Sequence, residues 1–319
     1  MSQEATVLSL SKEHILKCFH RFRQTHPGQP FVVAVSAPQG SGKTTLTRSL
    51  ESELSSLKLG VVSFSVDDFY LTFAEQNAVA QQPLASGSPN ALLQYRGNPG
   101  THDVELGSRL FAALTASHAE HLGDTAAQRT VSIPIYDKAL NQGRGDRLSP
   151  GLWRTAKPPF DIILFEGWCL GFRALSDAVL VERYSAVIAG DAESVDPVSG
   201  TSMVNTRRCR LEWLQDINAR LRQFEDQWYP FFECFVHIIP DSISHVYRWR
   251  IQQENSMRQQ LGQPDAGLTD DQVRDFVDRF MPLYELMMPT LCRDGLLGDG
   301  RYIQIHINEQ RACTGTRVI

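Results

Sequence analysis

Short apolar runs alternate along the chain with segments whose apolar residues recur at helical spacing. Residues 31–36 form an uninterrupted run rich in β-branched side chains, which is typical of a parallel strand buried on both faces. The next segment has leucines at helical spacing, and Gly60 stands where that helix would end. Further apolar runs predict four more strands, at residues 61–66, 162–165, 235–239 and 302–307.

Longer periodic segments predict an N-terminal helix at about residues 10–26 and helices near 207–227, 243–261 and 270–287. Strands that alternate with helices imply right-handed crossovers and a parallel sheet covered by helices on both faces. No linker clearly divides the sequence. We therefore expect one α/β domain over residues 1–319.

Three segments interrupt this alternation. Residues 75–105 are rich in Gln, Pro, Gly, Ser and Asn, and residues 137–160 are rich in Gly, Arg and Pro. Long loops in a compact domain are usually functional or disordered. We interpret residues 190–206, which are polar and poor in aromatic residues, as a surface insertion without chemistry.

Composition and charge exclude several classes of protein. The formal net charge of −5 disfavours a general affinity for nucleic acid, which calls for a basic surface. The six cysteines form no Cys-x-x-Cys pair, which argues against a zinc site or a disulfide framework and fits a reducing compartment. Neither a secretory signal, a transit peptide nor a membrane-spanning run is evident. We expect a cytoplasmic protein.

Residues 37–44, Ala-Pro-Gln-Gly-Ser-Gly-Lys-Thr, follow the first predicted strand and open a predicted helix. They match the P-loop pattern except that Ala37 replaces its first glycine. The backbone N–H groups of such a loop and the helix N-terminus bind phosphate oxygens. Lys43 would reach the β- and γ-phosphates of ATP, and the Thr44 hydroxyl would bind Mg²⁺. The predicted nucleotide-binding residues are Gln39, Gly40, Ser41, Gly42, Lys43, Thr44 and Thr45. A glycine-rich turn without a ligand is the alternative.

The P-loop alone does not specify the reaction. An Asn/Thr-Lys-x-Asp segment, which selects guanine in GTPases, is missing from the sequence. The apolar run at 162–165 ends in Glu166-Gly167 rather than in the Asp or Asp-Glu expected of motor ATPases. A kinase is the remaining interpretation.

Three carboxylates stand at the ends of predicted strands, where open α/β sheets bind ligands. Asp67 and Asp68 follow the strand at 61–66, and Glu166 follows the strand at 162–165. A kinase needs one carboxylate to accept the proton of the acceptor hydroxyl and others to hold Mg²⁺. We assign Asp67 as the base and a metal contact, Asp68 as the alternative base, and Glu166 as a partner of Mg²⁺. Helix or turn capping is the alternative role for the aspartates.

Residues 65–72 resemble the segment after the second strand in the uridine kinase and phosphoribulokinase group of P-loop kinases. Five motifs in order are similar to the D-glycerate 3-kinase family: residues 37–44, 96–103, 136–138, 143–147 and 165–168. This resemblance implies a P-loop NTPase fold with a five-stranded parallel sheet and a lid. It also implies ATP, Mg²⁺ and a small hydroxy-acid acceptor, with Asp67 matching the proposed base and Glu166 the acid near Mg²⁺.

The loops at 75–105 and 137–160 carry cations that suit such an acceptor, because a carboxylate pairs well with forked donors such as arginine. The candidate substrate-binding residues are Tyr70, Arg96, His102, Tyr136, Lys138, Arg144 and Arg147. The alternative is a solvated surface with a few charges. Taken alone, His102 is interpreted as a structural hydrogen-bonding residue.

Three arginines lie on the predicted helix near 243–261, in the region 245–262 that we expect to be the lid. Relative to Arg248, Arg250 lies at about 200° and Arg258 at about 80° around the helix axis, so the three cannot share one face. We assign Arg248 and Arg258 as candidates that steady the transferring phosphoryl group.

The sequence therefore predicts a kinase that phosphorylates D-glycerate to 3-phosphoglycerate with Mg-ATP. The alternatives are a kinase for a nucleoside, pantothenate or a sugar acid, and a non-catalytic ATP-binding protein. Neither the adenine pocket nor the oligomeric state follows from the sequence.

Overall fold

The computed structural model describes residues 6–121, 130–190, 204–262 and 267–319 of the chain. The helices within these ranges are α1 Val7–Thr25, α2 Lys43–Ser56, α3 Phe73–Gln81, α4 Val104–His121, α5 Asp177–Ala189, α6 Leu211–Gln227, α7 His245–Leu261, α8 Asp270–Asp278 and α9 Met281–Asp294. The strands are β1 Phe31–Ser36, β2 Val61–Ser65, β3 Val131–Ile133, β4 Tyr136–Asp137, β5 Asp146–Arg147, β6 Arg154–Ala156, β7 Ile162–Gly167, β8 Cys234–Pro240, β9 Tyr302–Ile307 and β10 Cys313–Val318. No helix in these ranges is long and apolar enough to cross a membrane.

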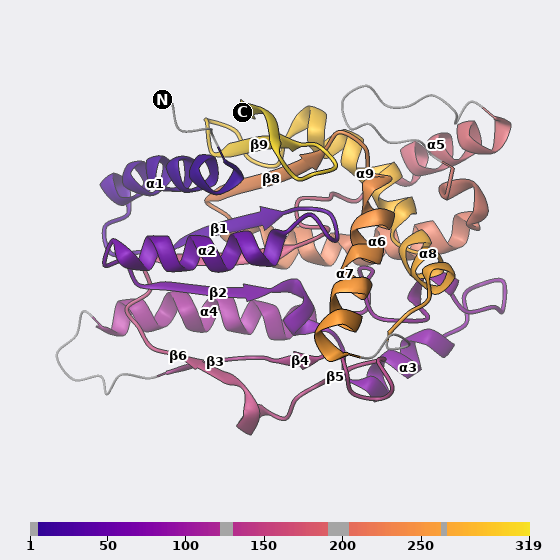
Figure 1. Cartoon of the computed structure of the whole chain (residues 1–319), viewed down its shortest axis with the longest axis horizontal. Coiled ribbons are helices and arrows are strands. Elements are labelled where there is room, and N and C mark those ends of the chain that lie inside the picture. The colour runs from indigo at the N-terminus through magenta and orange to yellow at the C-terminus, as the bar shows by residue number, and fades with distance from the viewer. Residues whose placement is uncertain (1–5, 122–129, 191–203, 263–266) are drawn as a thin grey trace.

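The central sheet has the strand order β10-β9-β8-β1-β7-β2 (Figure 1). Five of its strands, β9, β8, β1, β7 and β2, are parallel, which confirms the predicted α/β fold with five parallel strands. The sixth strand, β10, adds an antiparallel edge that the sequence analysis did not predict. Since β1 lies between β7 and β8, the segment that follows β1 emerges in the middle of the sheet.

Helices cover both faces of this sheet. On one face, α2 contacts β1, β2 and β7, while α1 contacts α2 and β9. On the other face, the ring of Phe111 from α4 packs on Phe64 of β2 and Phe165 of β7. Successive side chains of a strand point to opposite faces. Glu166 therefore points away from α4, toward the face that α2 covers.

The structure corrects four predicted boundaries. The helix predicted at 270–287 is two helices, α8 and α9, because α9 begins anew with Pro282 in its first turn. The loop predicted at 75–105 contains most of α3, and the loop at 137–160 contains a hairpin of β4 and β5 and the strand β6. The N-terminal helix begins at Val7 rather than near residue 10. Most of the insertion predicted at 190–206 lies outside the described residues.

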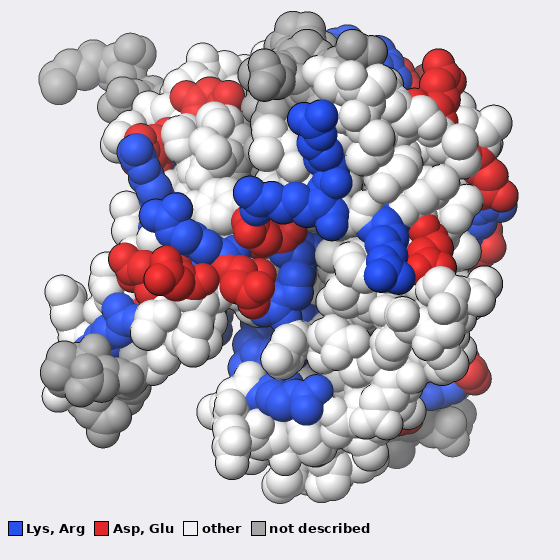
Figure 2. Space-filling view, turned by 90° about the vertical axis from the view of Figure 1, so that its right-hand side faces the viewer, with Lys and Arg blue, Asp and Glu red and all other residues white. Residues whose placement is uncertain are grey.

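The carboxyl ends of the parallel strands point to the side of the molecule on which α7 and α8 lie (Figure 1). The face seen from that side carries a mixed group of basic and acidic side chains at its centre (Figure 2). The candidate functional site is at this edge of the sheet.

Candidate active site

The loop between β1 and α2 has the backbone shape expected of a phosphate-binding loop. Gly40 and Gly42 adopt left-handed φ angles of 78° and 93°, which glycine permits at little cost. Gly42 is also the N-cap of α2, and the Ser41 hydroxyl donates to the carbonyl of Pro38 at 2.7 Å. The positive end of α2 and the bare backbone amides can therefore bind an anion at this loop.

Glu166 is buried at the base of the loop and contacts two of its residues. Its carboxylate pairs with the Lys43 ammonium and accepts a hydrogen bond from the Thr44 hydroxyl at 3.1 Å. Burial alone would lower the pKa of Lys43, but the charges of Glu166 and Asp67 outweigh it and raise the pKa. Lys43 is therefore a fixed positive charge in a setting that is only 14% exposed.

Asp67 acts on the same lysine as Glu166, and Ser65, two residues before Asp67, pairs with Glu166 in the sheet register. The Asp67 carboxylate pairs with the Lys138 ammonium at 2.5 Å. Burial would raise the pKa of Asp67, but Lys138 and Lys43 outweigh that effect and hold the pKa well below its ordinary value. Asp67 is thus an ionised carboxylate that faces the P-loop lysine.

Asp68 has a different role in the same turn. Its carboxylate accepts a hydrogen bond from the Ser65 backbone N–H at 2.8 Å, and the Ser65 hydroxyl accepts one from the Asp67 N–H. Burial raises the pKa of Asp68 to about 6. Asp68 closes the short turn at Val66–Phe69 that presents Asp67.

A cavity of about 170 Å³ lies between Asp67 and the P-loop, and we call it the Asp67 cavity. Its cations come from four separate parts of the chain: Lys43, Arg96, Lys138 and Arg250. Arg96 is fixed by a hydrogen bond to the Gly143 carbonyl at 2.8 Å and by the Tyr136 ring beneath it. The other lining residues are Gln39, Gly40, Thr44, Asp67, Tyr70, Trp168, Gln253, Phe276 and Phe280. The cavity is therefore small and positively charged, with one carboxylate among its cations.

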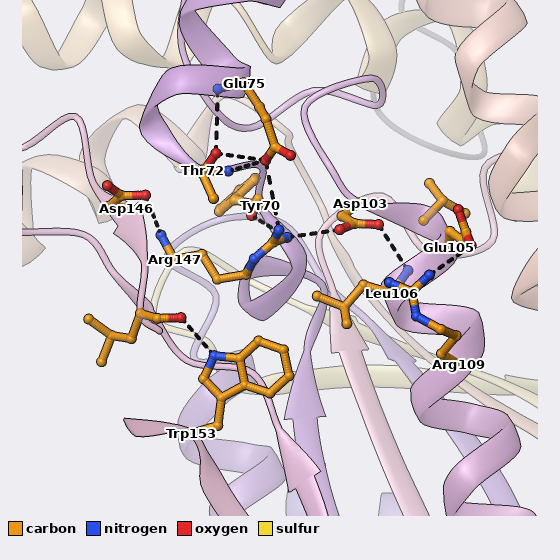
Figure 3. A network of polar contacts seen from close by, with 12 residues as sticks. Tyr70, Thr72, Glu75, Asp103, Glu105, Leu106, Arg109, Asp146, Arg147 and Trp153 are labelled. Atoms are coloured by element: carbon orange, nitrogen blue, oxygen red, sulfur yellow. Dashed lines mark hydrogen bonds and ion pairs between the residues drawn. The ribbon is translucent and has the colours of Figure 1, made fainter. Parts of the chain in front are cut away.

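Arg147, a candidate substrate ligand, instead holds the wall of the cavity together. It pairs with Asp103 at 3.2 Å and with Glu75 at 3.7 Å, and it donates to the Tyr70 carbonyl (Figure 3). Its side chain is 12% exposed. The contacts fix the backbone at Tyr70, whose side chain lines the Asp67 cavity.

Arg144, Tyr136 and His102 also lie in the supporting layer rather than in the lining. Arg144 stacks on the ring of Phe73, and its carbonyl accepts a hydrogen bond from the Tyr136 hydroxyl at 3.1 Å. His102 is buried against the Tyr70 ring, and neither imidazole nitrogen has a hydrogen-bond partner among the described residues. The structural hydrogen bond expected of His102 therefore has no partner among the described side chains. Burial lowers the pKa of His102 to about 3, so the ring is neutral.

Helix α7 crosses the P-loop and determines which arginine reaches the cavity. A Cβ atom on Gly40 would lie 2.5 Å from the Cβ of Trp249, so the helix and the loop are in direct contact. Arg250, the residue after Trp249, lines the Asp67 cavity, and Glu254 pairs with it at 2.5 Å.

The two arginines that the sequence analysis selected on this helix do not line the cavity. Arg248 is 69% exposed and pairs with Glu309, and Arg258 donates to Asn255 and to the Leu268 carbonyl. The helical spacing showed that the arginines could not share a face. Which face meets the P-loop depends on the packing of Trp249, which spacing does not reveal. A catalytic role for Arg248 or Arg258 stays a prediction.

Lys43 also lines a second cavity, of about 430 Å³, which we call the Arg311 cavity. Arg311 donates to the Gly40 carbonyl at 2.8 Å and so joins the β9–β10 hairpin to the P-loop. The cavity is lined by Thr6, Val7, Leu8, Ser41, Gly42, Lys43, Thr45, Leu46, Ser49, Ile238, Ile307, Arg311, Ala312 and Cys313. Sequence reasoning missed it because its walls come from the first turn of α1 and from a hairpin whose second strand was not predicted.

Comparison with known proteins finds relatives over nearly the whole chain, although no protein-family model matches. A chloroplastic D-glycerate 3-kinase of Arabidopsis thaliana is 36% identical over 294 residues, which are 91% of this chain but 55% of the plant protein. A probable ATP-dependent kinase of Saccharomyces cerevisiae is 31% identical over 318 residues, covering 98% of this chain and 96% of that protein. The structure of a D-glycerate 3-kinase from Cryptococcus neoformans superposes with a TM-score of 0.82 at 32% identity, covering 99% of this chain and 100% of the other.

Proposed function

This chain belongs to the D-glycerate 3-kinase family of P-loop kinases, and we propose that it transfers the γ-phosphoryl group of ATP to D-glycerate to form 3-phosphoglycerate. One observation carries the proposal. An ionised carboxylate, Asp67, stands in a small cationic cavity beside a P-loop lysine. The cavity offers an anionic acceptor a place next to the base and the bound phosphates.

The P-loop and the Arg311 cavity together would hold ATP. The loop amides and Lys43 bind the phosphates, and Lys43 exchanges part of its contact with Glu166 for phosphate oxygens. The adjoining Arg311 cavity has room for the adenine base and apolar walls, including Leu46 and Ile307. Because Lys43 lines both cavities, an ATP molecule with its base in one would present its γ-phosphate to the other.

The residues around Thr44 also fit a magnesium ion. The Thr44 hydroxyl and the Glu166 carboxylate are in contact, Asp67 lines the same cavity as Thr44, and all three offer the hard oxygen ligands that Mg²⁺ prefers. Bound there with ATP, Mg²⁺ would neutralise charge on the phosphates.

Asp67 is the proposed base for the acceptor hydroxyl. The pKa of Asp67 is held low, so the carboxylate is ionised at neutral pH and can accept a hydrogen bond and then the proton of the hydroxyl. Lys138 and Lys43 keep it oriented toward the cavity.

The acceptor carboxylate would bind to Arg96, Lys138 and Arg250. Charged donors of this kind bind carboxylates strongly, and Arg96 and Arg250 are already fixed by their own partners. Cavities for drug-sized ligands measure about 300–1,000 Å³, so the Asp67 cavity of about 170 Å³ suits a small hydroxy acid better than a nucleoside or pantothenate.

The test is ADP release in a coupled assay with D-glycerate, L-glycerate, uridine, pantothenate and gluconate as acceptors. We expect turnover that depends on D-glycerate and falls roughly 10²–10⁴-fold in Asp67→Asn, because the base is lost. Asp68→Asn is the matched control, because Asn can still accept the Ser65 N–H, and it should stay within a few-fold of wild type. Full activity of Asp67→Asn would exclude this base. ATP binding without turnover of any acceptor would support the non-catalytic alternative instead.

The proposed compartment is the cytoplasm. All six cysteines are free thiols, and five of them are buried, which suits a reducing environment. Fluorescence microscopy of the tagged full-length protein, checked by fractionation, tests this placement.

A further inference from the structure

Three side chains with metal-binding atoms meet away from both cavities, where α1 packs against the sheet. His14 and Cys18 lie on the buried face of α1, and Cys234 begins β8. Their ligand atoms all lie within 4.8 Å of one another. The three residues are only 5%, 3% and 0% exposed, so the cluster is enclosed by protein.

The geometry of this cluster is close to that of a zinc site. His14 and Cys18 are one helical turn apart, so their side chains share a face. The Cys18 sulfur is 3.7 Å from His14 Nε2, and neighbouring nitrogen and sulfur ligands of a tetrahedral zinc ion are about 3.5 Å apart. The Gly300 carbonyl oxygen accepts a hydrogen bond from the Cys18 thiol at 3.5 Å, so it lies beside the same sulfur and can serve as a fourth ligand atom once that thiol loses its proton.

The charges of the cluster also suit zinc. Two thiolates and one neutral imidazole balance a divalent ion, so the complete site would be neutral, as a buried site requires. Thiolate and imidazole donors select zinc over the hard ions Mg²⁺ and Ca²⁺.

We propose that His14, Cys18 and Cys234 bind one zinc ion, with the Gly300 carbonyl as the fourth ligand, and that this ion fastens α1 to the central sheet. The absence of a Cys-x-x-Cys pair led the sequence analysis to argue against zinc. That argument fails for ligands that come from a helix and a strand far apart in the sequence. The site has a structural consequence, because the first turn of α1 lines the Arg311 cavity.

The proposal predicts metal binding by the full-length chain. After chelation and dialysis, titration with Zn²⁺ should load one equivalent per chain, measured by mass spectrometry of the metal. Titration with Co²⁺ should give a thiolate-to-cobalt charge-transfer band in the near ultraviolet and the intense visible bands of tetrahedral cobalt. Zinc should also raise the melting temperature by several degrees, because it binds the folded state alone.

Matched variants separate this site from adventitious binding. Cys18→Ser, Cys234→Ser and His14→Gln should each remove the cobalt bands and the zinc-dependent rise in melting temperature. Cys209→Ser, which changes a buried cysteine elsewhere in the fold, should keep both.

Three results would overturn the proposal. The first is the absence of cobalt–thiolate absorption in the wild-type protein. The second is cobalt absorption that none of the three ligand variants changes. The third is a thiol count that shows a Cys18–Cys234 disulfide in place of zinc. Because the first of these uses wild-type protein, the test holds even if a variant fails to fold.

Discussion

At the scale of single residues, Gly40 is restricted in two ways, by its backbone and by its neighbour. Its φ of 78° costs an alanine about 1–2 kcal/mol, and a Cβ atom would also collide with Trp249 of α7. Gly40→Ala should therefore destabilise the fold and weaken ATP binding, because α7 must shift from the P-loop. Chemical denaturation and calorimetric titration with an ATP analogue measure the two effects.

Gly42→Ala is the control for this experiment. Gly42 has a similar φ of 93°, but nothing lies within 4 Å of its Cβ position. The Gly42→Ala variant should therefore show the loss of stability that the left-handed backbone causes, without a collision with α7. Equal losses of stability in the two variants would mean that α7 does not press on the loop.

The neighbouring Asp67 and Asp68 should change the pH dependence of stability in opposite directions. Lys138 and Lys43 outweigh burial and lower the folded pKa of Asp67, so its contribution to stability is present above the unfolded pKa near 3.8 and is lost as the pH falls. Burial raises the folded pKa of Asp68 to about 6, so its ionisation costs stability as the pH rises from about 4 to 6.

Urea denaturation of the ligand-free protein between about pH 3 and 7 tests this pair. Relative to wild type, Asp67→Asn should lose stability as the pH rises from the acid end of this range. Asp68→Asn should gain stability relative to wild type as the pH rises through about 6. A change of the same sign in both variants would contradict the assigned environments.

The sequence predicted many of the residues at the candidate site. It did not predict which of them line the Asp67 cavity and which of them hold its walls in place. Lys43, Thr44 and Asp67 could be recognised because a motif or a strand end fixes where they stand. Arg147 and Arg96 are both arginines in predicted substrate-binding loops, and nothing in the sequence distinguishes their roles. The carboxylates of Asp103 and Glu75, which hold Arg147 away from the lining, are contacts that only the fold creates.

At the scale of elements, local signals explain two of the missed boundaries. Thr72 and Glu75 form a capping box that opens α3 just before the predicted loop, into which the helix continues, and Pro282 marks the first turn of α9. Both signals are visible in the sequence. In contrast, β10 lies at the edge of the sheet, and most of its residues are exposed. Its sequence contains no apolar run from which a strand could be predicted.

Two of the ion pairs made by helix α7 should differ greatly in importance. Glu254 is buried, pairs with Arg250 and accepts the Leu268 N–H at 3.1 Å, whereas the Arg248–Glu309 pair is largely exposed. Glu254→Gln should cost about 2 kcal/mol of unfolding free energy and lower kcat/KM for D-glycerate, because Arg250 loses its orientation.

Glu309→Gln, on the exposed pair, should cost less than about 0.5 kcal/mol and leave kcat/KM nearly unchanged. Thermal denaturation and steady-state kinetics measure both variants. If Glu309→Gln were the more damaging change, the orientation of α7 over the P-loop would have to be different.

At the scale of the whole molecule, the net charge of −5 does not reveal that the charge around the candidate site is positive. The Asp67 cavity draws its cations from the P-loop, from the loops before α4 and after β4, and from α7. The order of strands and helices was predictable from hydrophobic periodicity, but the convergence of these four segments was not. It depends on tertiary contacts such as Trp249 on Gly40, which leave no pattern in the sequence.

This convergence makes a prediction about the acceptor. If the cations around Asp67 bind a carboxylate, D-glyceramide, which has the same shape without the charge, should have a kcat/KM roughly 100-fold lower than D-glycerate. Added KCl should raise the KM for D-glycerate, because ions screen charges that are partly exposed to water, and should leave the KM for D-glyceramide nearly constant. Steady-state assays of both acceptors over a range of KCl concentrations measure these effects. Equal efficiency for the two acceptors would show that the cations serve the phosphates of ATP and that another group recognises the acceptor.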